Sequence, residues 1–252
     1  MEVTIIGAGN MGRGIGGRVV AGGHDLMVID HDPDDARRLA EELDGAGDGS
    51  ARGGGADEAV RGDVVVLAVY YDAARQAVEE RGEQLDGKVV VDITNPVDAE
   101  TFDGLVTPAD SSAAEELAKL APDGARLVKA FNTTFAATLP KGEVAGQQLD
   151  VFIAGDDSEA KQAVAELVSS GGLNPIDAGP LRRARELERL GFLPWRSRRR
   201  SGRTSRAPSR SSTSSVVGAS GRSARATPLL DQPDQGRVQW PGAVVPRRRP
   251  AE

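Results

Sequence analysis

The stretch that most constrains the fold is Val3–Gly12, an apolar strand pattern that runs directly into Gly-x-Gly-x-x-Gly. A helical pattern follows at once, which is the context that a dinucleotide-binding loop requires. Gly7 allows a tight turn, Gly9 allows the backbone to approach a pyrophosphate, and Gly12 allows the helix to pack closely on the strand. The helix N-terminus then presents free N–H groups and a positive dipole end to the phosphates. The predicted cofactor loop comprises Gly7, Ala8, Gly9, Asn10, Met11 and Gly12.

Strand and helix patterns alternate along the rest of the body. Strands are expected at 3–7, 25–30, 63–69, 88–93, 126–131, 149–154 and 173–176, and helices at 10–21, 34–43, 72–84, 111–120 and 158–170. This alternation predicts an α/β fold, a Rossmann-type doubly wound, mainly parallel sheet with helices on both faces. The NAD(P)-binding domain is placed at 1–180. Further expectations are a mobile glycine-rich loop at 45–55, a short helix near 57–61 and a helix opening at 132–139.

Charge divides the chain into two unlike parts. Residues 1–192 carry 18 Lys/Arg and 35 Asp/Glu, a net charge of −17, whereas residues 193–252 carry 13 Arg and 3 acidic residues, a net charge of +10. A C-terminal helical segment begins at 181–193 and is truncated there, because no hydrophobic period continues beyond Pro194. Residues 194–252 are rich in Arg, Ser and Pro and are predicted to be a disordered tail.

The composition excludes several classes of protein. The chain has no cysteine, so it can form neither disulfides nor thiolate metal sites, and it has no cysteine nucleophile. It shows no run of about 18 apolar residues, which predicts no membrane partner. A strand pattern begins at residue 3, which leaves no room for a signal peptide and favours a cytoplasmic location. The acidic body argues against a nucleic-acid partner.

Ligands of an open α/β sheet lie at the carboxyl ends of its strands. The cofactor is therefore expected to meet the end of strand 63–69 and the end of strand 88–93, and the substrate to meet the end of strand 126–131. The candidate cofactor residues are Asp30, His31, Ala68, Val69, Tyr70, Asn95 and Pro96, and the candidate substrate residues are Asn132 and Thr133. Asn95 could equally belong to an ordinary Asn-Pro turn, and Asn132 could equally cap a helix. Of Tyr70 and Tyr71, one packed and one exposed ring is as good an expectation as direct contact with the cofactor.

Six stretches together resemble the NADPH-dependent reductases of coenzyme F420, a deazaflavin hydride carrier, which share their N-terminal domain with pyrroline-5-carboxylate reductases. The matching stretches are 5–14, 63–73 (DVVVLAVYYDA), 87–97 (GKVVVDITNPV), 127–134 (LVKAFNTT), 151–156 (VFIAGD) and 177–192 (DAGPLRRARELERLGF). The resemblance covers about residues 1–192. It implies hydride transfer between NADP and coenzyme F420, and a homodimer.

Two departures from the family pattern qualify this interpretation. Members of the family continue past Leu193 with more helix, whereas the tail here has the composition of an out-of-frame reading of a GC-rich gene. We interpret 194–252 as either a frameshift product or an evolved basic tail. In the family, the further helix closes the domain and helps to form the dimer. Its replacement here therefore weakens the expectation of a dimer and predicts that the far side of the active site is missing.

The second departure concerns the nucleotide. Asp30 lies 21 residues after Gly9, where an acid hydrogen-bonds the ribose 2′-OH of NAD and repels a 2′-phosphate. Asp30 and the neighbouring His31 are expected to set the choice of nucleotide. The resemblance places NADP ahead, and NAD stays open.

Acid–base candidates are scarce, and the sequence offers no metal-ligand cluster or nucleophile motif. His24 and His31 are not placed to protonate a substrate, and Lys129 is expected to have a packed stem and a solvated head. We therefore assign no catalytic residue. Hydride transfer between a nicotinamide and a deazaflavin needs orientation of two rings more than a protein acid. The alternatives are an NAD(P)-dependent reductase of a small imine or carbonyl compound, and a non-catalytic NAD(P)-binding protein.

Overall fold

The computed structural model describes residues 1–200 of the chain, with side chains described through Leu193. Strands of this part form one sheet in the order β10-β9-β6-β5-β4-β1-β2-β3. Their bounds are β1 Glu2–Ile6, β2 Asp25–Ile29, β3 Ala51–Gly54, β4 Val64–Leu67, β5 Val89–Asp92, β6 Arg126–Lys129, β9 Asp150–Gly155 and β10 Asn174–Gly179. Neighbouring strands pair in parallel except β6 and β9, which are antiparallel. The predicted Rossmann-type, mainly parallel sheet is confirmed.

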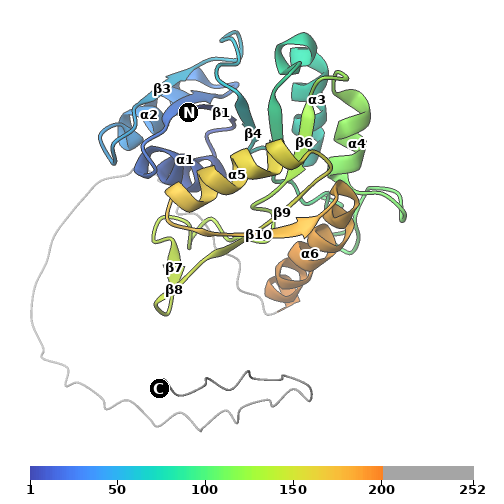
Figure 1. Ribbon diagram of the computed structural model, residues 1–252. Helices are drawn as coiled ribbons and strands as arrows, with labels where there is room; N and C mark the ends of the chain where they lie inside the picture. Colours follow the sequence, from blue (N-terminus) through green and yellow to red (C-terminus); the bar gives the residue numbers. More distant parts are fainter. Residues whose placement is uncertain (201–252) are drawn as a thin grey trace, which may run out of the picture. The chain divides into compact units, whose positions relative to one another are not determined.

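Helices cover both faces of the sheet (Figure 1). Their bounds are α1 Asn10–Ala21, α2 Pro33–Leu43, α3 Tyr71–Arg81, α4 Ala113–Leu120, α5 Ser158–Ser170 and α6 Ala184–Arg200, with 3-10 turns η1 at Gly82–Leu85 and η2 at Leu181–Arg183. Alternate residues of each strand enter two separate cores. Val64 and Val66 pack with α1, α2 and α5, whereas Val65 and Leu67 pack with α3 and α4. Because both faces are buried, the strands read as continuous apolar runs.

Side-chain caps fix the starts of three helices. The Asp32 carboxylate accepts from Asp34 N at 3.0 Å before α2, whose first residue is Pro33. Ser112 Oγ accepts from Glu115 N at 3.2 Å before α4. Asp157 accepts from Ala160 N at 2.7 Å before α5. These caps satisfy N–H groups that the first helical turn leaves unpaired, which is why the expected starts agree with the observed ones to within two residues.

The predicted mobile loop at 45–55 is wrong over its second half, because residues 51–54 form β3 beside β2. The glycines there serve close packing. A Cβ at Gly53 would lie 2.2 Å from the backbone oxygen of Ala36 in α2. The glycine run therefore brings a helix against an edge strand, which the sequence pattern did not distinguish from a loop.

Two short helices expected from the sequence are not formed. Residues 57–61 make turns and coil because tertiary partners take their backbone groups: Gln84 Oε1 accepts from Val60 N at 2.9 Å and Thr4 Oγ1 accepts from Arg61 N at 3.0 Å. Residues 132–139 form successive turns rather than a helix, and they follow Phe131, whose φ is +60°. The backbone bonds that follow join residues three apart, as turns do: Thr134 N donates to Phe131 O at 3.0 Å and Thr138 N to Phe135 O at 2.9 Å.

A two-stranded hairpin, β7 (Glu143–Val144) and β8 (Gln147–Gln148), was not predicted. Its two loop residues, Ala145 and Gly146, both have positive φ, as a tight two-residue turn requires. At the other end of the described part, α6 continues to Arg200, past the predicted truncation at 193. The rest of the predicted tail lies outside the described residues.

Within residues 1–200, every helix is too short or too polar to cross a membrane.

Candidate functional site

The glycine loop lies between β1 and α1, and each glycine has a distinct environment. Gly7 has φ +115°, and a Cβ there would lie 2.5 Å from the backbone oxygen of Ala68. A Cβ at Gly12 would lie 2.0 Å from the Gly7 oxygen. By contrast, a Cβ at Gly9 would meet nothing within 4 Å. Gly7 and Gly12 are therefore required by the packing of the protein itself. Gly9 is not, and its missing side chain leaves space for a ligand on the open side of the loop.

This geometry fits a nucleotide pyrophosphate. Gly9 and Asn10 are exposed, Ala8 and Met11 are half-buried, and Gly7 and Gly12 are buried. The first turn of α1 carries no acidic side chain. Free N–H groups and the positive end of the helix dipole thus face the open side of the loop, which is the arrangement that binds phosphate.

Asp30 is hydrogen-bonded to the glycine loop itself. Its Oδ2 accepts from Ala8 N at 2.7 Å, its Oδ1 accepts from Asp32 N at 3.1 Å, and its Oδ1 lies 2.6 Å from His31 Nδ1. The side chain is 13% exposed, whereas that of His31 is 93% exposed. Asp30 therefore holds the loop in place while it keeps a negative charge beside the predicted adenosine ribose.

Ala68, Val69 and Tyr70 follow β4, adjacent to the glycine loop. Val69 approaches Gly7, since a Cβ at Gly7 would lie 2.8 Å from Val69 Cγ1. Tyr70 is 91% exposed, whereas Tyr71 packs against the core formed with α3 and α4. One ring is therefore exposed and one packed, which is one of the two expected arrangements.

Asn95 and Asn132 are brought together across the ends of β5 and β6. Asn132 Nδ2 donates to Asn95 Oδ1 at 2.9 Å, and Asn95 Nδ2 donates to the backbone oxygen of Asn132 at 2.9 Å. Asn132 Nδ2 also donates to Leu187 O in α6 at 2.9 Å. We call Asn95 and Asn132 the amide pair. Pro96, which follows Asn95 in the sequence, is buried. Thr133, which follows Asn132, is half-buried.

The expectation for Lys129 is wrong, because its ammonium group is enclosed rather than solvated. The side chain is fully buried, and Nζ lies 2.8 Å from Asp92 Oδ2 and 2.8 Å from Glu188 Oε1. Nζ also donates to Thr94 O at 2.5 Å. Burial opposes the charge on Lys129, but the two carboxylates outweigh it and raise the pKa of Lys129. Burial raises the pKa of Glu188. We call Lys129, Asp92 and Glu188 the buried charge cluster.

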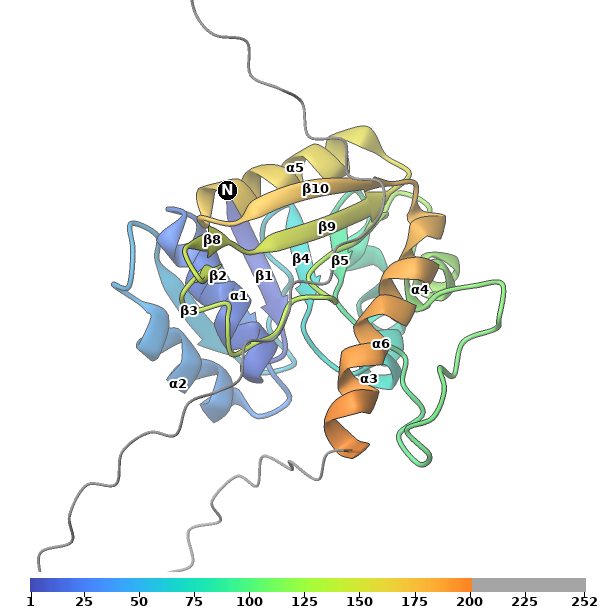
Figure 2. The ribbon, with the colours of Figure 1, turned by 90° about the horizontal axis from the view of Figure 1, so that it is seen from below.

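Sequence reasoning missed Glu188 and Gly191. Both lie in α6, which Figure 2 shows beside α4. A Cβ at Gly191 would lie 2.6 Å from Asn95 Oδ1, so glycine is needed for α6 to approach the amide pair. The signal was available: Ala184, Leu187, Glu188 and Gly191 follow the i, i+3, i+4, i+7 spacing of one helix face. An acid on such a face indicates a buried partner.

His24 lies away from this edge, as expected. It precedes β2, where Nε2 lies 2.7 Å from Ser170 Oγ and Nδ1 lies 3.0 Å from the N-terminal amine. Burial, assisted by the positive N-terminus, lowers the pKa of His24. Its role is in packing of the opposite end of the sheet.

Comparison with known proteins identifies relatives of this arrangement. The family described as NADP oxidoreductase, coenzyme F420-dependent, matches residues 2–96. The F420-dependent NADP reductase of Methanothermobacter thermautotrophicus is 31% identical over 201 residues, which cover 75% of this chain and 86% of the relative. The metalloreductase STEAP3 of Rattus norvegicus is 32% identical over 198 residues, which cover 77% of this chain but 38% of that protein's length.

A solved structure from Arthrobacter sp. FB24, described as an F420-dependent NADP reductase, is also similar. It is 29% identical, has a TM-score of 0.67, and is matched over 79% of this chain and 94% of its own. The match to the family covers the glycine loop, and the similarity to the methanogen enzyme extends over 201 residues. The chain therefore belongs to the family of coenzyme F420-dependent NADP oxidoreductases.

Proposed function

We propose that this chain transfers a hydride between NADP(H) and coenzyme F420. The names of its relatives support this assignment, and so does a site built for orientation. The nicotinamide, when bound, supplies or accepts the hydride. The protein binds the pyrophosphate through the loop at 7–12 and orients the nicotinamide end through the residues that follow β4 and β5.

The observation that carries the proposal is the enclosure of Lys129. This amine was the nearest candidate proton donor at the substrate end of the sheet, and both carboxylates of the buried charge cluster hold it away from any ligand. Asn95, Asn132 and Thr133 provide hydrogen bonds there but carry no titratable proton. Transfer between two ring carriers depends on proximity and orientation, which such groups can supply without a protein acid.

The nucleotide preference is testable through Asp30. In Asp30→Asn the amide oxygen can still accept from Ala8 N, while the negative charge beside the ribose is lost. We expect affinity for NADPH to rise relative to NADH, because a carboxylate repels the 2′-phosphate. Fluorescence titration of the wild type and the variant with both nucleotides measures the ratio. An unchanged ratio would show that Asp30 does not face the 2′ position.

The direct test of function is an absorbance assay with oxidised coenzyme F420 and NADPH, repeated with NADH. Loss of the deazaflavin absorbance at a rate that depends on enzyme concentration supports the proposal. Nucleotide binding without any change of absorbance, in either direction of the reaction, overturns it. Size-exclusion chromatography of the same full chain tests the homodimer that the resemblance implies.

A second candidate is reduction of a small imine or carbonyl compound by NAD(P)H. One observation favours it: Tyr70, which follows β4, is 91% exposed, so its phenol could donate a proton. A panel of cyclic imines and ketones, assayed with wild type and Tyr70→Phe, discriminates the two candidates. Turnover that Tyr70→Phe abolishes supports this alternative. Binding without turnover of any substrate class leaves a non-catalytic nucleotide-binding protein.

A further inference from the structure

The buried charge cluster joins four elements at one point. Lys129 ends β6, Asp92 ends β5, and Glu188 lies in the second turn of α6. Glu188 Oε2 also accepts from Ala113 N at 3.0 Å, and Ala113 is the first residue of α4. The positive end of the α4 dipole therefore faces the same carboxylate. One acidic side chain of α6 is thus bonded to a strand end and to a helix start.

Stability alone does not explain why this point is ionic. Replacement of a buried ion cluster by apolar residues of similar volume is often neutral or stabilising, whereas removal of one charged partner is costly. An apolar contact could have held α6 against α4 with less geometric definition. The charged hydrogen bond of 2.8 Å from Lys129 Nζ and the 3.0 Å bond from Ala113 N fix the position of Glu188 along and around the axis of α6.

The same turn of α6 touches the amide pair. Leu187, which precedes Glu188, accepts from Asn132 Nδ2 through its backbone oxygen. At Gly191, three residues after Glu188, Asn95 leaves no room for a Cβ. The position of Glu188 therefore determines how the amides of Asn95 and Asn132 are held, although Glu188 touches neither side chain through a hydrogen bond of its own.

We propose that Glu188 is a positioning residue for hydride transfer, acting through α6 on the Asn95–Asn132 amide pair. The proposal rests on the proposed function, in which this pair lies at the nicotinamide end of the nucleotide. Glu188 does not contact substrate. It holds α6 so that the amide pair keeps one orientation during transfer.

Steady-state kinetics of the full chain test this role with three variants. Glu188→Ala removes the bonds to both Lys129 and Ala113, and we expect kcat to fall by about tenfold to a hundredfold while the KM for NADPH changes by less than about threefold. Glu188→Gln keeps the shape of the side chain and leaves Lys129 paired with Asp92, so it should recover most of the rate. Glu186→Ala, on the exposed side of the same helix, should behave as wild type.

The isotope effect separates positioning from general loosening. With NADPH deuterated at the transferred position, Glu188→Ala should show a larger isotope effect on kcat than wild type, because transfer itself becomes slower. Circular dichroism at the assay temperature verifies that each variant is folded. The proposal is overturned if Glu188→Ala is folded and keeps the wild-type kcat. It is also overturned if kcat falls equally in the Glu186→Ala control.

A second measurement does not depend on the identity of the hydride acceptor. The side-chain amide signals of Asn95 and Asn132, assigned in nitrogen-15 spectra of the full chain, should shift or broaden in Glu188→Ala and stay in place in Glu186→Ala. Unchanged signals in Glu188→Ala overturn the positioning role. If the wild type never reduces coenzyme F420 but Glu188→Ala still shifts these signals, only the proposed function is overturned.

Discussion

At the scale of single residues, the three glycines of the loop are not equivalent. A Cβ added at Gly7 or Gly12 would lie 2.5 Å or 2.0 Å from a backbone oxygen of the protein, so neither position accepts a side chain. Gly9 has extended backbone with φ −72° and open space around it. Substitution at Gly9 therefore interferes with a ligand, whereas substitution at Gly12 interferes with the fold.

Gly9→Val should weaken nucleotide binding while the variant stays folded. The branched side chain would occupy the approach of the pyrophosphate, so we expect the Kd for NADPH to rise at least about tenfold, or about 1.4 kcal/mol. Fluorescence titration measures the Kd, and thermal unfolding measures stability.

Gly17→Ala is the matched control for this variant. A Cβ there makes an ordinary 3.7 Å contact with Leu43 inside the packing of α1. It should leave nucleotide affinity unchanged and raise stability by up to about 1 kcal/mol, because alanine favours a helix interior. Wild-type affinity in Gly9→Val would refute the assignment of the loop.

At the scale of elements, the edge strand β3 shows how a glycine run is used. Residues Arg52 to Gly54 pair with β2, and α2 crosses directly over Gly53. A side chain at this position would push α2 away from the sheet. The α2–β3 contact lies beside Asp30, since Asp30 N donates to Gly54 O at 3.3 Å, so it also supports the nucleotide end of the site.

Gly53→Ala should therefore destabilise the fold by about 1–3 kcal/mol, the usual cost of overpacking a closed contact. Chemical denaturation followed by circular dichroism measures the loss. Gly104→Ala, in the connection between β5 and α4, is the control, because a Cβ there meets nothing within 4 Å. Equal stability of the two variants would show that α2 yields without cost.

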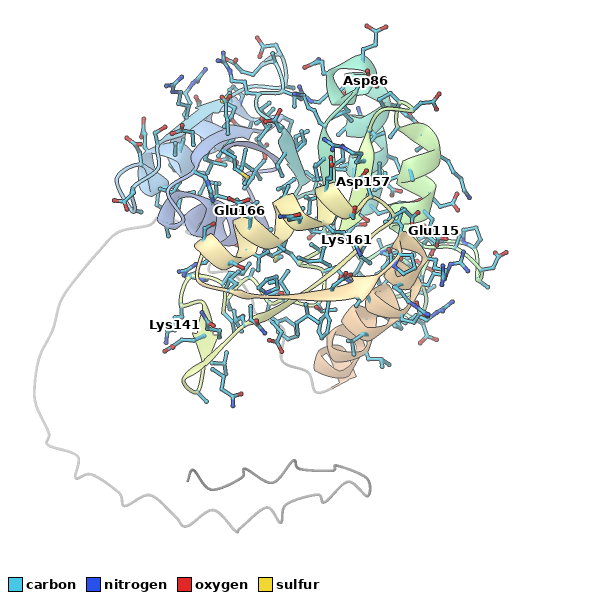
Figure 3. All side chains as sticks on the ribbon, viewed as in Figure 1. Asp86, Glu115, Lys141, Asp157, Lys161 and Glu166 are labelled. Carbon is cyan, nitrogen blue, oxygen red and sulfur yellow. The ribbon has the colours of Figure 1, made fainter. Side chains whose placement is uncertain are left out.

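At the scale of the whole described unit, α6 is joined to the sheet and to α4 by two sets of charges. The first is the buried charge cluster. The second lies at the surface: Arg185 donates to both carboxylate oxygens of Glu115, at 2.7 Å and 2.6 Å. Figure 3 labels Glu115 at the end of α4 that meets α6. The hydrogen bonds from Arg185 hold the pKa of Glu115 below its usual value of 4.5.

The attachment of α6 should therefore weaken in acid. Because the folded-state pKa of Glu115 is lowered, the ion pair stabilises the fold above pH 4.5, and this contribution is lost as the pH falls through the folded-state pKa. Glu115→Gln should be less stable than wild type at pH 7, and the difference should shrink as the pH falls below 4.5. Thermal unfolding across this range measures it.

Glu79→Gln provides the control for this prediction. Glu79 lies on the exposed surface of α3, 4.0 Å from Arg75, with a side chain that is 55% exposed. Its unfolding midpoint should follow the wild type at each pH, since exposed pairs contribute little. A Glu115→Gln variant that keeps a constant deficit at every pH would contradict the assignment.

The local features of this protein could be predicted from the sequence. The glycine fingerprint located α1 and periodicity located α5 at their observed bounds, and the order of strand, glycine loop and helix located the open side of the loop. These features depend on neighbours within a few residues, so a one-dimensional pattern contains them. The family resemblance, carried by the same motifs, agreed with the relatives found by comparison.

The contacts that side chains make across the sheet could not be predicted in this way. Lys129 was expected to reach solvent, and it is enclosed because Glu188, 59 residues later, supplies a carboxylate at the same depth. Gly53 was expected in a loop, whereas in the fold α2 packs directly against it. The free energy of a buried charge depends on partners brought close by the fold, and a linear pattern gives no distance between them. The dinucleotide loop therefore follows from the order of residues along the chain, whereas the position of α6 over the amide pair follows from three-dimensional packing.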